Sequence, residues 1–207
     1  MARAIPAERF GQLIEVATKT FVARGYRLTQ MSDVAAGLGV AKGTLYGYVE
    51  SKEALFDAAV RFADGHVAEP EPSALPLPTP AAGSTVRYVQ SRLLEEVRDL
   101  ELARVLAQPK QAGGKVGELE SIVRDLYRRM SRNRRALKLI DRCAVDHPEL
   151  AAVWFEQGRY GQVALLATYL EKRSATGEVR PAVNVQLAAR MVLEILYVVL
   201  DPRVRYR

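Results

Sequence analysis

The apolar positions of the first sixty residues follow the period of an α-helix. They recur at steps of three and four over residues 7–24, and Gly25 comes next as a helix end. The same spacing predicts a second helix from an N-cap at Thr29 to Leu38, and a short third helix over residues 42–49. A fourth helix follows directly. This part of the chain is therefore expected to be a small group of helices, one of them very short.

The periodic pattern is interrupted by a segment rich in proline. Five of the ten prolines fall within residues 69–84, and proline removes a backbone donor that a helix needs. We interpret residues 68–84 as an extended linker, with a proline-rich recognition motif as the alternative. Beyond it, helical spacing returns in five segments, which are residues 85–107, 118–132, 133–146, 148–173 and 181–200.

No segment shows the two-residue alternation that is typical of a strand, so the sequence predicts an all-α fold. The linker over residues 68–84 separates a helical head, residues 1–67, from a larger helical domain, residues 85–207. The breaks expected within the larger domain are residues 108–117, 147–148 and 176–178.

Composition limits the classes of protein to which this chain can belong. It has 207 residues, of which 49% are hydrophobic, enough for a substantial core. Cys143 is the only cysteine, which rules out an intrachain disulfide and fits a reducing compartment. The first residues lack the apolar run of a signal peptide, and charged residues interrupt the apolar segment 182–200. We therefore expect a cytoplasmic protein without a membrane span.

The residue patterns that carry catalysis in most enzymes are missing from the sequence. It has two histidines, and it has no phosphate-binding glycine loop, no metal-spaced cysteines and no nucleophile elbow. We expect no catalytic residues, no metal and no cofactor. The net charge of +6 permits a polyanionic partner, but residues 1–66 carry eight basic residues against seven acidic ones. Any contact with nucleic acid must therefore depend on where individual cations lie.

Residues 31–52 meet the steric demands of a helix-turn-helix unit. Two helices that cross through a tight turn need a small residue at the crossing, which Ala35 supplies, and a residue that tolerates positive φ, which Gly39 supplies. The second helix of such a unit enters the major groove of DNA. Gly43 and Gly47 would let its backbone approach the duplex closely. The donors expected on its outward faces and at the next helix are Lys42, Thr44, Tyr46, Tyr48 and Lys52.

Residues 21–56 resemble the N-terminal DNA-binding domain of TetR/AcrR-type transcriptional regulators. The residues that carry the resemblance are Phe21, Gly25, Thr29, Val34, Ala35, Gly39, Val40, residues 42–46, residues 51–55 and Phe56. It implies phosphate contacts by Thr29, Gln30, Tyr46, Tyr48 and Lys52. It implies base-reading or groove-facing positions at Ser32, Lys42, Gly43, Thr44 and Gly47.

The chain departs from the family pattern at two of these positions. Ala41 stands where the family usually has serine, so a capping hydroxyl is missing. Gly47 stands where many members have an aromatic or charged residue, so a contact side chain is missing as well.

The resemblance also implies that the remaining helices form a ligand-binding and dimerisation domain. Residues 182–200 are apolar in nearly every direction except a stripe of Gln186, Arg190 and Glu194, so this helix must be covered on two sides. We expect one cover to be a second subunit, with a monomer and a buried helical hairpin as the alternative. The expected dimer interface is Val153, Gly158, Gly161, Leu165, Leu187, Met191 and Ile195. The expected effector pocket is Tyr88, Leu94, Tyr127, Trp154 and Phe155, for which a simple core role is the alternative.

The function that the resemblance implies is that of a sequence-specific regulator, a ligand-responsive repressor that acts as a homodimer on a palindromic operator in double-stranded DNA. A small-molecule effector of unknown identity would act through the helix over residues 51–64, which is expected to join the two parts. The alternative is a helical protein-interaction module with a weakened DNA-binding head. Residues 121–142 carry eight basic and two acidic residues, which indicates an anionic-ligand or second nucleic-acid surface, or else a solvated helix face.

Overall fold

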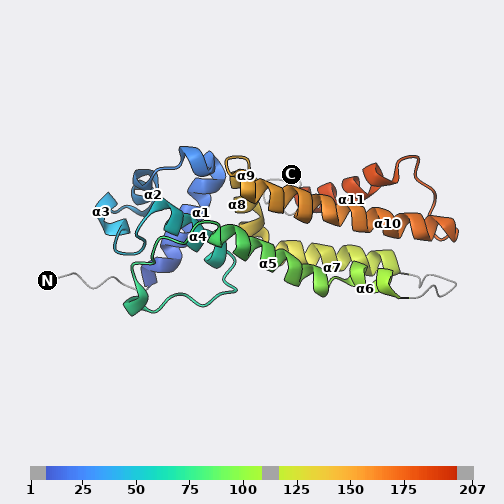
Figure 1. Cartoon of the computed structure of the whole chain (residues 1–207), viewed down its shortest axis with the longest axis horizontal. Coiled ribbons are helices and arrows are strands. Elements are labelled where there is room, and N and C mark those ends of the chain that lie inside the picture. The colour runs from blue at the N-terminus through green and yellow to red at the C-terminus, as the bar shows by residue number, and fades with distance from the viewer. Residues whose placement is uncertain (1–7, 109–116, 200–207) are drawn as a thin grey trace. The chain divides into compact units, whose positions relative to one another are not determined.

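The computed structural model describes residues 8–108 and 117–199, and their regular secondary structure is helical (Figure 1). Within these two ranges, extended backbone is paired only in an isolated parallel bridge between Val49 and Leu77. The prediction of an all-α fold is confirmed.

The chain folds into two compact units. Unit 1 combines the residues up to Tyr88 with Asn133–Ala151, and unit 2 combines Val89–Arg132 with the residues from Ala152 onward. Residues 133–151 therefore pack with the head although they lie far along the sequence. The division follows from contacts alone, so the functional boundaries expected from the sequence stay a prediction.

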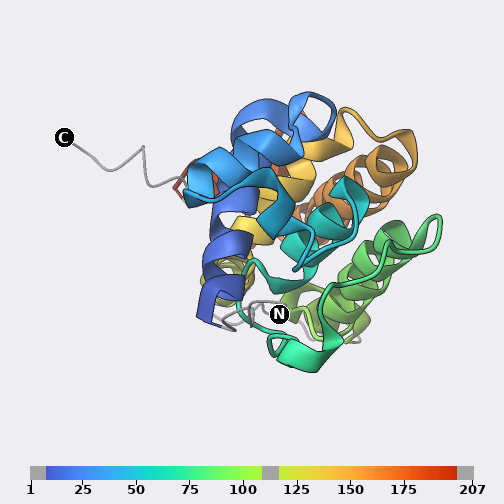
Figure 2. The same ribbon diagram turned by 90° about the vertical axis from the view of Figure 1, so that its left-hand side faces the viewer.

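Unit 1 is built around its first helix. Its helices are α1 (Glu8–Leu28), α2 (Met31–Leu38), α3 (Lys42–Leu45), α4 (Lys52–Phe62), α8 (Arg134–Ala144) and α9 (Pro148–Ala151), with a 3-10 turn η1 (Pro72–Ala74) and the start of α5 (Ser84–Arg98). The apolar face of α1 from Phe10 to Phe21 is buried, and α1 packs against α2, α4 and α8 (Figure 2). Gly25, at the predicted helix end, breaks the helical backbone with a φ of 79°.

The helix predicted over residues 51–64 is present as α4, with Ser51 as its N-cap. α4 ends at Phe62 within unit 1, and residues 63–83 connect it to α5. The chain first enters unit 2 within α5, between Tyr88 and Val89. Within unit 1, α4 packs against α8, which lies beyond the linker in the sequence, so the prediction that this helix joins the two parts of the sequence stays a prediction. Gly65, with a φ of 70°, turns the chain away from the helical path directly after α4.

Unit 2 is a second helical core. It contains α5 from Val89 onward, α6 (Glu101–Ala107), α7 (Glu118–Arg132), a π-helix η2 (Ala152–Tyr160), α10 (Gly161–Ala175) and α11 (Val185–Val199). Ile122, Trp154 and Leu166 are among its most deeply buried side chains. Of the described helices, none is long and apolar enough to cross a membrane.

The predicted helical segments of unit 2 differ from the structure in detail. The segment expected to be a single helix over residues 85–107 divides at Asp99, and the segment 148–173 is helical but contains the π-helix. The break expected over residues 108–117 lies, except for its two end residues, outside the described residues.

Candidate nucleic-acid interface

The predicted helix-turn-helix unit is present in unit 1. Ala35 is buried where α2 approaches α3, and Gly39 ends α2 with a φ of 70° and a ψ of 33°. The Gly39 N–H donates to the Ala36 carbonyl at 3.1 Å, and the Val40 N–H donates to the Ala35 carbonyl at 3.0 Å. Because L side chains rarely adopt this left-handed conformation, the turn requires glycine at this position.

The second helix of the unit, α3, is shorter than predicted. It spans only Lys42–Leu45, and the following residues continue as turns in which the Gly47 N–H donates to the Thr44 carbonyl at 3.2 Å. Ala41 occupies the N-cap position, and no side chain caps this end of the helix. A single turn with glycine inside it has little stability of its own, so neighbouring side chains must hold α3 in place.

Most of the predicted contact residues lie on the surface of this unit. Lys42, Gly43, Thr44 and Tyr46 are exposed on or directly after α3, and Gln30 and Ser32 are exposed at the start of α2. Gly47 is half-buried. A methyl group at Gly43 would meet no atom of the protein within 4 Å. The surface of the unit thus carries an ammonium group, an amide, three hydroxyls and an open stretch of backbone.

Two of the predicted phosphate contacts lie in the core instead. Tyr48 is 1% exposed, whereas Tyr46 is 43% exposed, because the turn after α3 directs Leu45, Tyr48 and Val49 inward. Thr29 is also buried, and its hydroxyl donates to the Gly25 carbonyl at 2.7 Å. We therefore leave both side chains out of the interface proposed below.

The N-cap of α2 is Gln30, so the prediction of an N-cap at Thr29 is wrong. The Gln30 N–H donates to the Asp33 carboxylate at 2.8 Å, which satisfies a backbone donor at this end of the helix. Asp33 also pairs with Arg24 of α1. The sequence signal that was missed is the acidic residue three positions after the cap.

Lys52 is held at the N-terminus of α4 by groups of the α1 end. Its ammonium nitrogen lies 3.3 Å from the Arg27 carbonyl oxygen and 4.5 Å from the centre of the Tyr26 ring. The Tyr26 ring in turn meets the edge of His147, with centroids 4.8 Å apart, and the Arg27 N–H donates to Asp146 at 3.0 Å. The turn between α8 and α9 therefore supports the residues on which Lys52 rests.

The acidic partner in this cluster is Glu53. Hydrogen bonds to the Glu53 carboxylate, first from its own backbone N–H and then from the hydroxyls of Tyr26 and Ser51, hold the pKa of Glu53 below its ordinary value. Burial, together with the Glu53 charge, raises the pKa of Tyr26. At neutral pH the pair is a phenol donating to a carboxylate at 3.1 Å, which fixes the ring below Lys52.

The residues predicted for an effector pocket are scattered. Leu94 and Tyr127 are exposed, and Trp154 is buried in the core of unit 2. Tyr88 belongs to unit 1, where the Arg61 guanidinium lies 4.1 Å from the centre of its ring. Phe155 lines a hollow in unit 2.

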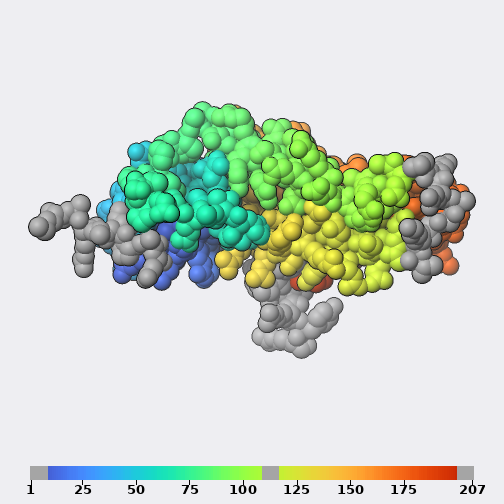
Figure 3. Space-filling model, turned by 90° about the horizontal axis from the view of Figure 1, so that it is seen from below, coloured from blue at the N-terminus to red at the C-terminus, as the bar shows by residue number. Residues whose placement is uncertain are grey.

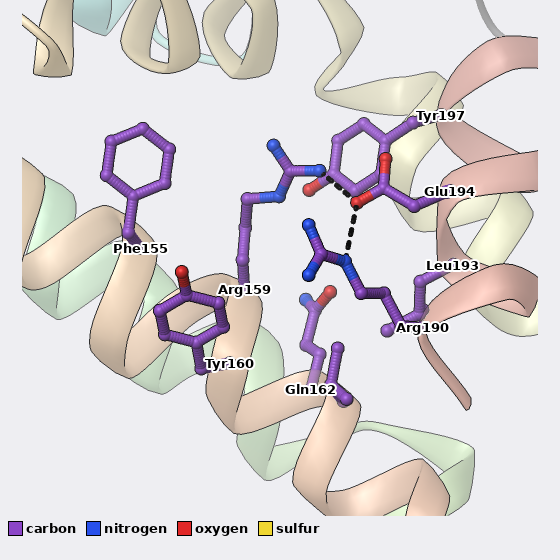
Figure 4. A pocket seen from close by; sticks show the side chains of 9 residues that line it. Phe155, Arg159, Tyr160, Gln162, Arg190, Leu193, Glu194 and Tyr197 are labelled. Carbon is purple, nitrogen blue, oxygen red and sulfur yellow. Dashed lines mark hydrogen bonds and ion pairs between the residues drawn. The ribbon is translucent and has the colours of Figure 1, made fainter. Parts of the chain in front are cut away.

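That hollow lies between the π-helix, α10 and α11, and its volume is about 170 Å³. Figure 4 shows the guanidinium groups of Arg159 and Arg190 on two sides of the Glu194 carboxylate. The nitrogen-to-oxygen distances are 2.6 Å from Arg159 and 3.9 Å from Arg190. The lining residues are Phe155, Arg159, Tyr160, Gln162, Val163, Arg190, Leu193, Glu194 and Tyr197. Helical spacing places Arg190 and Glu194 on one stripe, but Arg159 lies on another helix, and no local pattern in the sequence connects it with them.

The residues predicted for a dimer interface fall into two groups. Val153 and Gly158 are buried within unit 2, and a methyl group at Gly158 would be 3.4 Å from Leu93. Leu187, Met191 and Ile195 are 54%, 56% and 57% exposed at steps of four along α11. Leu165 is half-buried, and a methyl group at Gly161 would meet nothing within 4 Å. The structure therefore leaves an apolar stripe of α11 on the surface of the single chain.

The arginine-rich segment 121–142 is divided between α7 and α8. In α7, Arg129 pairs with Asp125 at 2.9 Å and with Glu96 at 3.1 Å. In α8, the Arg135 guanidinium donates to the Ala63 carbonyl at 3.4 Å, and its backbone N–H donates to the Asp64 carboxylate at 2.9 Å. Part of the basic segment is therefore used in contacts inside each unit.

Comparison with known proteins places the helix-turn-helix unit in a family. Residues 13–59 match the family described as bacterial regulatory proteins, tetR family. The HTH-type transcriptional repressor KstR2 of Mycobacterium tuberculosis is 42% identical over 53 residues, which are 26% of this chain and 26% of that protein. The uncharacterized HTH-type transcriptional regulator YhgD of Bacillus subtilis is 47% identical over 45 residues, which are 22% of this chain and 24% of that protein.

These sequence matches span about a quarter of each relative. Over the whole chain, the structure is similar to that of the ketosteroid transcriptional regulator KstR2 of Mycobacterium tuberculosis, with a TM-score of 0.56 and 19% identity, covering 100% of this chain and 87% of that one. At this identity the likeness concerns the fold alone. The predicted resemblance to TetR/AcrR-type regulators is confirmed over residues 13–59, which match the tetR family.

Proposed function

We propose that this chain is a transcriptional repressor that binds double-stranded DNA through its TetR-type domain. The observation that carries the proposal is the exposed surface of α3, where Lys42, Thr44 and Tyr46 surround the open backbone of Gly43. KstR2, a relative that shares this domain, is named a transcriptional repressor. A helix at this position of a helix-turn-helix unit enters the major groove.

The contacts divide into two kinds. Gln30, Tyr46 and Lys52 would bind phosphates from positions beside α3, and this part of the affinity depends on salt. Lys42, Thr44 and Ser32 would face base edges, with Gly43 at the closest backbone approach and Gly47 behind it. Only the second kind of contact distinguishes sequences, so selectivity rests on very few side chains.

The repressor acts as a homodimer in this proposal. The apolar stripe of Leu187, Met191 and Ile195 on α11 supports it, because three large side chains more than half exposed at helical spacing are typical of a helix that packs against another subunit. Leu165 and the open position at Gly161 on α10 extend this surface. Two TetR-type domains on a twofold axis would read two halves of a palindrome.

Response to a small effector is the last part of the proposal. The hollow beside the π-helix carries two arginines and one glutamate, which is a net charge of +1, together with three aromatic rings. This lining favours a small molecule with an anionic group and an apolar body. The π-helix that lines the hollow continues directly from α9, which belongs to unit 1. This π-helix has nine residues. π-Helices are rare in proteins, and those that do occur are frequently found at functional sites.

Selection of bound fragments from a random duplex library tests the DNA-binding proposal. A recovered palindrome supports sequence-specific binding by a homodimer. Recovery of no sequence by protein that is folded and pure contradicts the proposal and favours the alternative of a helical protein-interaction module. The single turn of α3 without a side-chain cap is the observation that keeps this alternative open.

The effector proposal is tested separately, on the selected duplex. Small aromatic carboxylates are added, with the neutral amides of the same shape as controls. Release of DNA by a carboxylate, lost in Arg190→Gln, supports the hollow as its site. A carboxylate that binds wild-type protein without changing its affinity for the duplex contradicts the effector response.

A further inference from the structure

The connection between α4 and α5, residues 63–83, is attached to the head. We call this segment the strap. The Leu77 N–H donates to the Tyr48 carbonyl at 2.8 Å, and the Glu50 N–H donates to the Leu77 carbonyl at 3.0 Å. These two bonds form the isolated parallel bridge between Val49 and Leu77. Figure 2 shows the blue-green strap passing over the head before it reaches α5.

Thr79 extends this attachment to the start of α4. Its N–H donates to the Glu50 carboxylate at 2.9 Å, and its hydroxyl donates to the Ser51 hydroxyl at 2.9 Å. The Ser51 hydroxyl also accepts from the Ala54 N–H at 3.1 Å, as the N-cap of α4. The strap is therefore bonded to each of three consecutive elements: the end of the α3 turn, the junction after it and the cap of α4.

Both ends of the strap are held on unit 1 as well. Near its start, the Glu69 carboxylate lies against α1, since a methyl group at Gly11 would be 2.8 Å from it. Just beyond its end, the Thr85 hydroxyl donates to Asp57 of α4 at 2.7 Å. Figure 3 shows the blue-green residues of the strap covering part of the surface beside the blue residues of the head. The strap thus follows a defined path along the domain.

The residues that the strap holds are those that connect the two kinds of DNA contact. Residues 48–51 lie between α3, which would enter the groove, and Lys52, which would bind a phosphate. Because α3 is a single turn without a side-chain cap, it does not fix its own orientation against α4. The strap itself contains no lysine or arginine, so it offers no cation to a phosphate. Its chemistry suits a role in positioning.

We propose that the strap is a positioning element that sets the orientation of α3 relative to Lys52 and thereby sets the affinity for DNA. Leu77 acts through its backbone and Thr79 through its backbone and hydroxyl. The inference rests on the proposed DNA-binding function and adds to it a segment that the TetR-type match, residues 13–59, does not include.

The test uses the full chain and a duplex of mixed sequence at several salt concentrations. Leu77→Pro removes the N–H that donates to Tyr48, and Leu77→Ala is its control because it keeps that N–H. Thr79→Val removes the hydroxyl, and Thr79→Ser keeps it. We expect Leu77→Pro and Thr79→Val each to weaken binding about fivefold, the factor that one ordinary hydrogen bond represents, while both controls bind as wild type does.

The dependence of DNA affinity on salt distinguishes a positioning role of the strap from a direct contact with phosphate. We expect the salt slope of the strap variants to equal that of wild type, because no phosphate contact is lost, whereas Tyr46→Ala lowers it. Unchanged affinity in folded variants would overturn the proposal, and so would a lowered slope. If Leu77→Pro does not fold, Thr79→Val compared with Thr79→Ser decides. Wild-type protein that binds no duplex would overturn the proposed function instead.

Discussion

Two glycines of the helix-turn-helix unit have different physical reasons for being there. Gly39 has a positive φ that an L side chain rarely adopts, so its role is in folding. Gly43 lies inside α3 with open space around its missing side chain, and glycine weakens a helix. Nothing in the fold of the described residues requires glycine at position 43, which agrees with a role in close approach to DNA.

We expect Gly43→Ala to keep the free energy of unfolding or raise it, by up to about 1 kcal/mol, because alanine favours the helix. The same change should weaken binding of duplex DNA about tenfold, since the methyl group would occupy the closest approach. Gly39→Ala is the control and should cost roughly 1 kcal/mol of stability. Urea unfolding and a binding titration measure both quantities. Full affinity in Gly43→Ala would remove this residue from the interface.

The thiol of Cys143 gives unit 1 a dependence on alkaline pH. Burial raises the pKa of Cys143 from 9.0 to about 12. The folded state therefore keeps the proton while the unfolded thiol loses it, so the stabilisation is complete below about pH 9 and is lost as the pH rises from 9 toward 12. Urea unfolding of wild type should weaken with pH over this window more steeply than that of Cys143→Ala, in which no thiol titrates. Parallel pH profiles would contradict the buried, protonated thiol.

At the scale of secondary-structure elements, α3 is the helix of unit 1 that depends most on its neighbours for stability. It has four residues, a glycine at its second position and Ala41 at its N-cap. By contrast, α4 starts with a serine cap and buries six of its eleven residues. The contacts of α3 with α2, and the bonds between the strap and residues 48–50, compensate for what α3 lacks.

Adding a cap to α3 should stabilise it. Ala41→Ser supplies an oxygen for an orphan N–H of the first turn and should raise the free energy of unfolding by about 0.5 to 1 kcal/mol. Ala41→Gly, which adds no acceptor side chain, is the comparison. Because a capped α3 is better ordered, we also expect tighter binding of duplex DNA. Urea unfolding with no gain over wild type would show that α3 is already fixed by its neighbours.

At the scale of the whole molecule, the prediction concerns the apolar stripe on α11. Met191→Glu places a charge in the proposed contact between subunits, and the cost of burying it should convert the dimer to a monomer. Val145→Glu is the control, since Val145 is an exposed apolar residue of unit 1. Light scattering with size-exclusion chromatography measures the mass. Met191→Glu should also bind the selected palindrome at least about tenfold more weakly, because two half-sites no longer bind together.

The retention of a dimer in Met191→Glu would exclude this stripe as the interface, whereas a wild-type monomer would exclude the homodimer itself. The buried positions Val153 and Gly158 are unsuitable for such a test, because they pack inside unit 2 and their substitution would disturb the fold.

The sequence by itself determined the features that depend on neighbouring residues. Helical periodicity gave the helices, Gly39 the turn, and Ser51 the cap of α4, because these are local consequences of side-chain shape and backbone conformation. Only the tertiary structure decided which of Tyr46 and Tyr48 reaches the surface, that α8 packs on α1, and that the proline-rich strap bonds to residues 48–51. Each of these features depends on contacts between residues far apart along the chain. A local sequence pattern does not specify which distant residues come into contact.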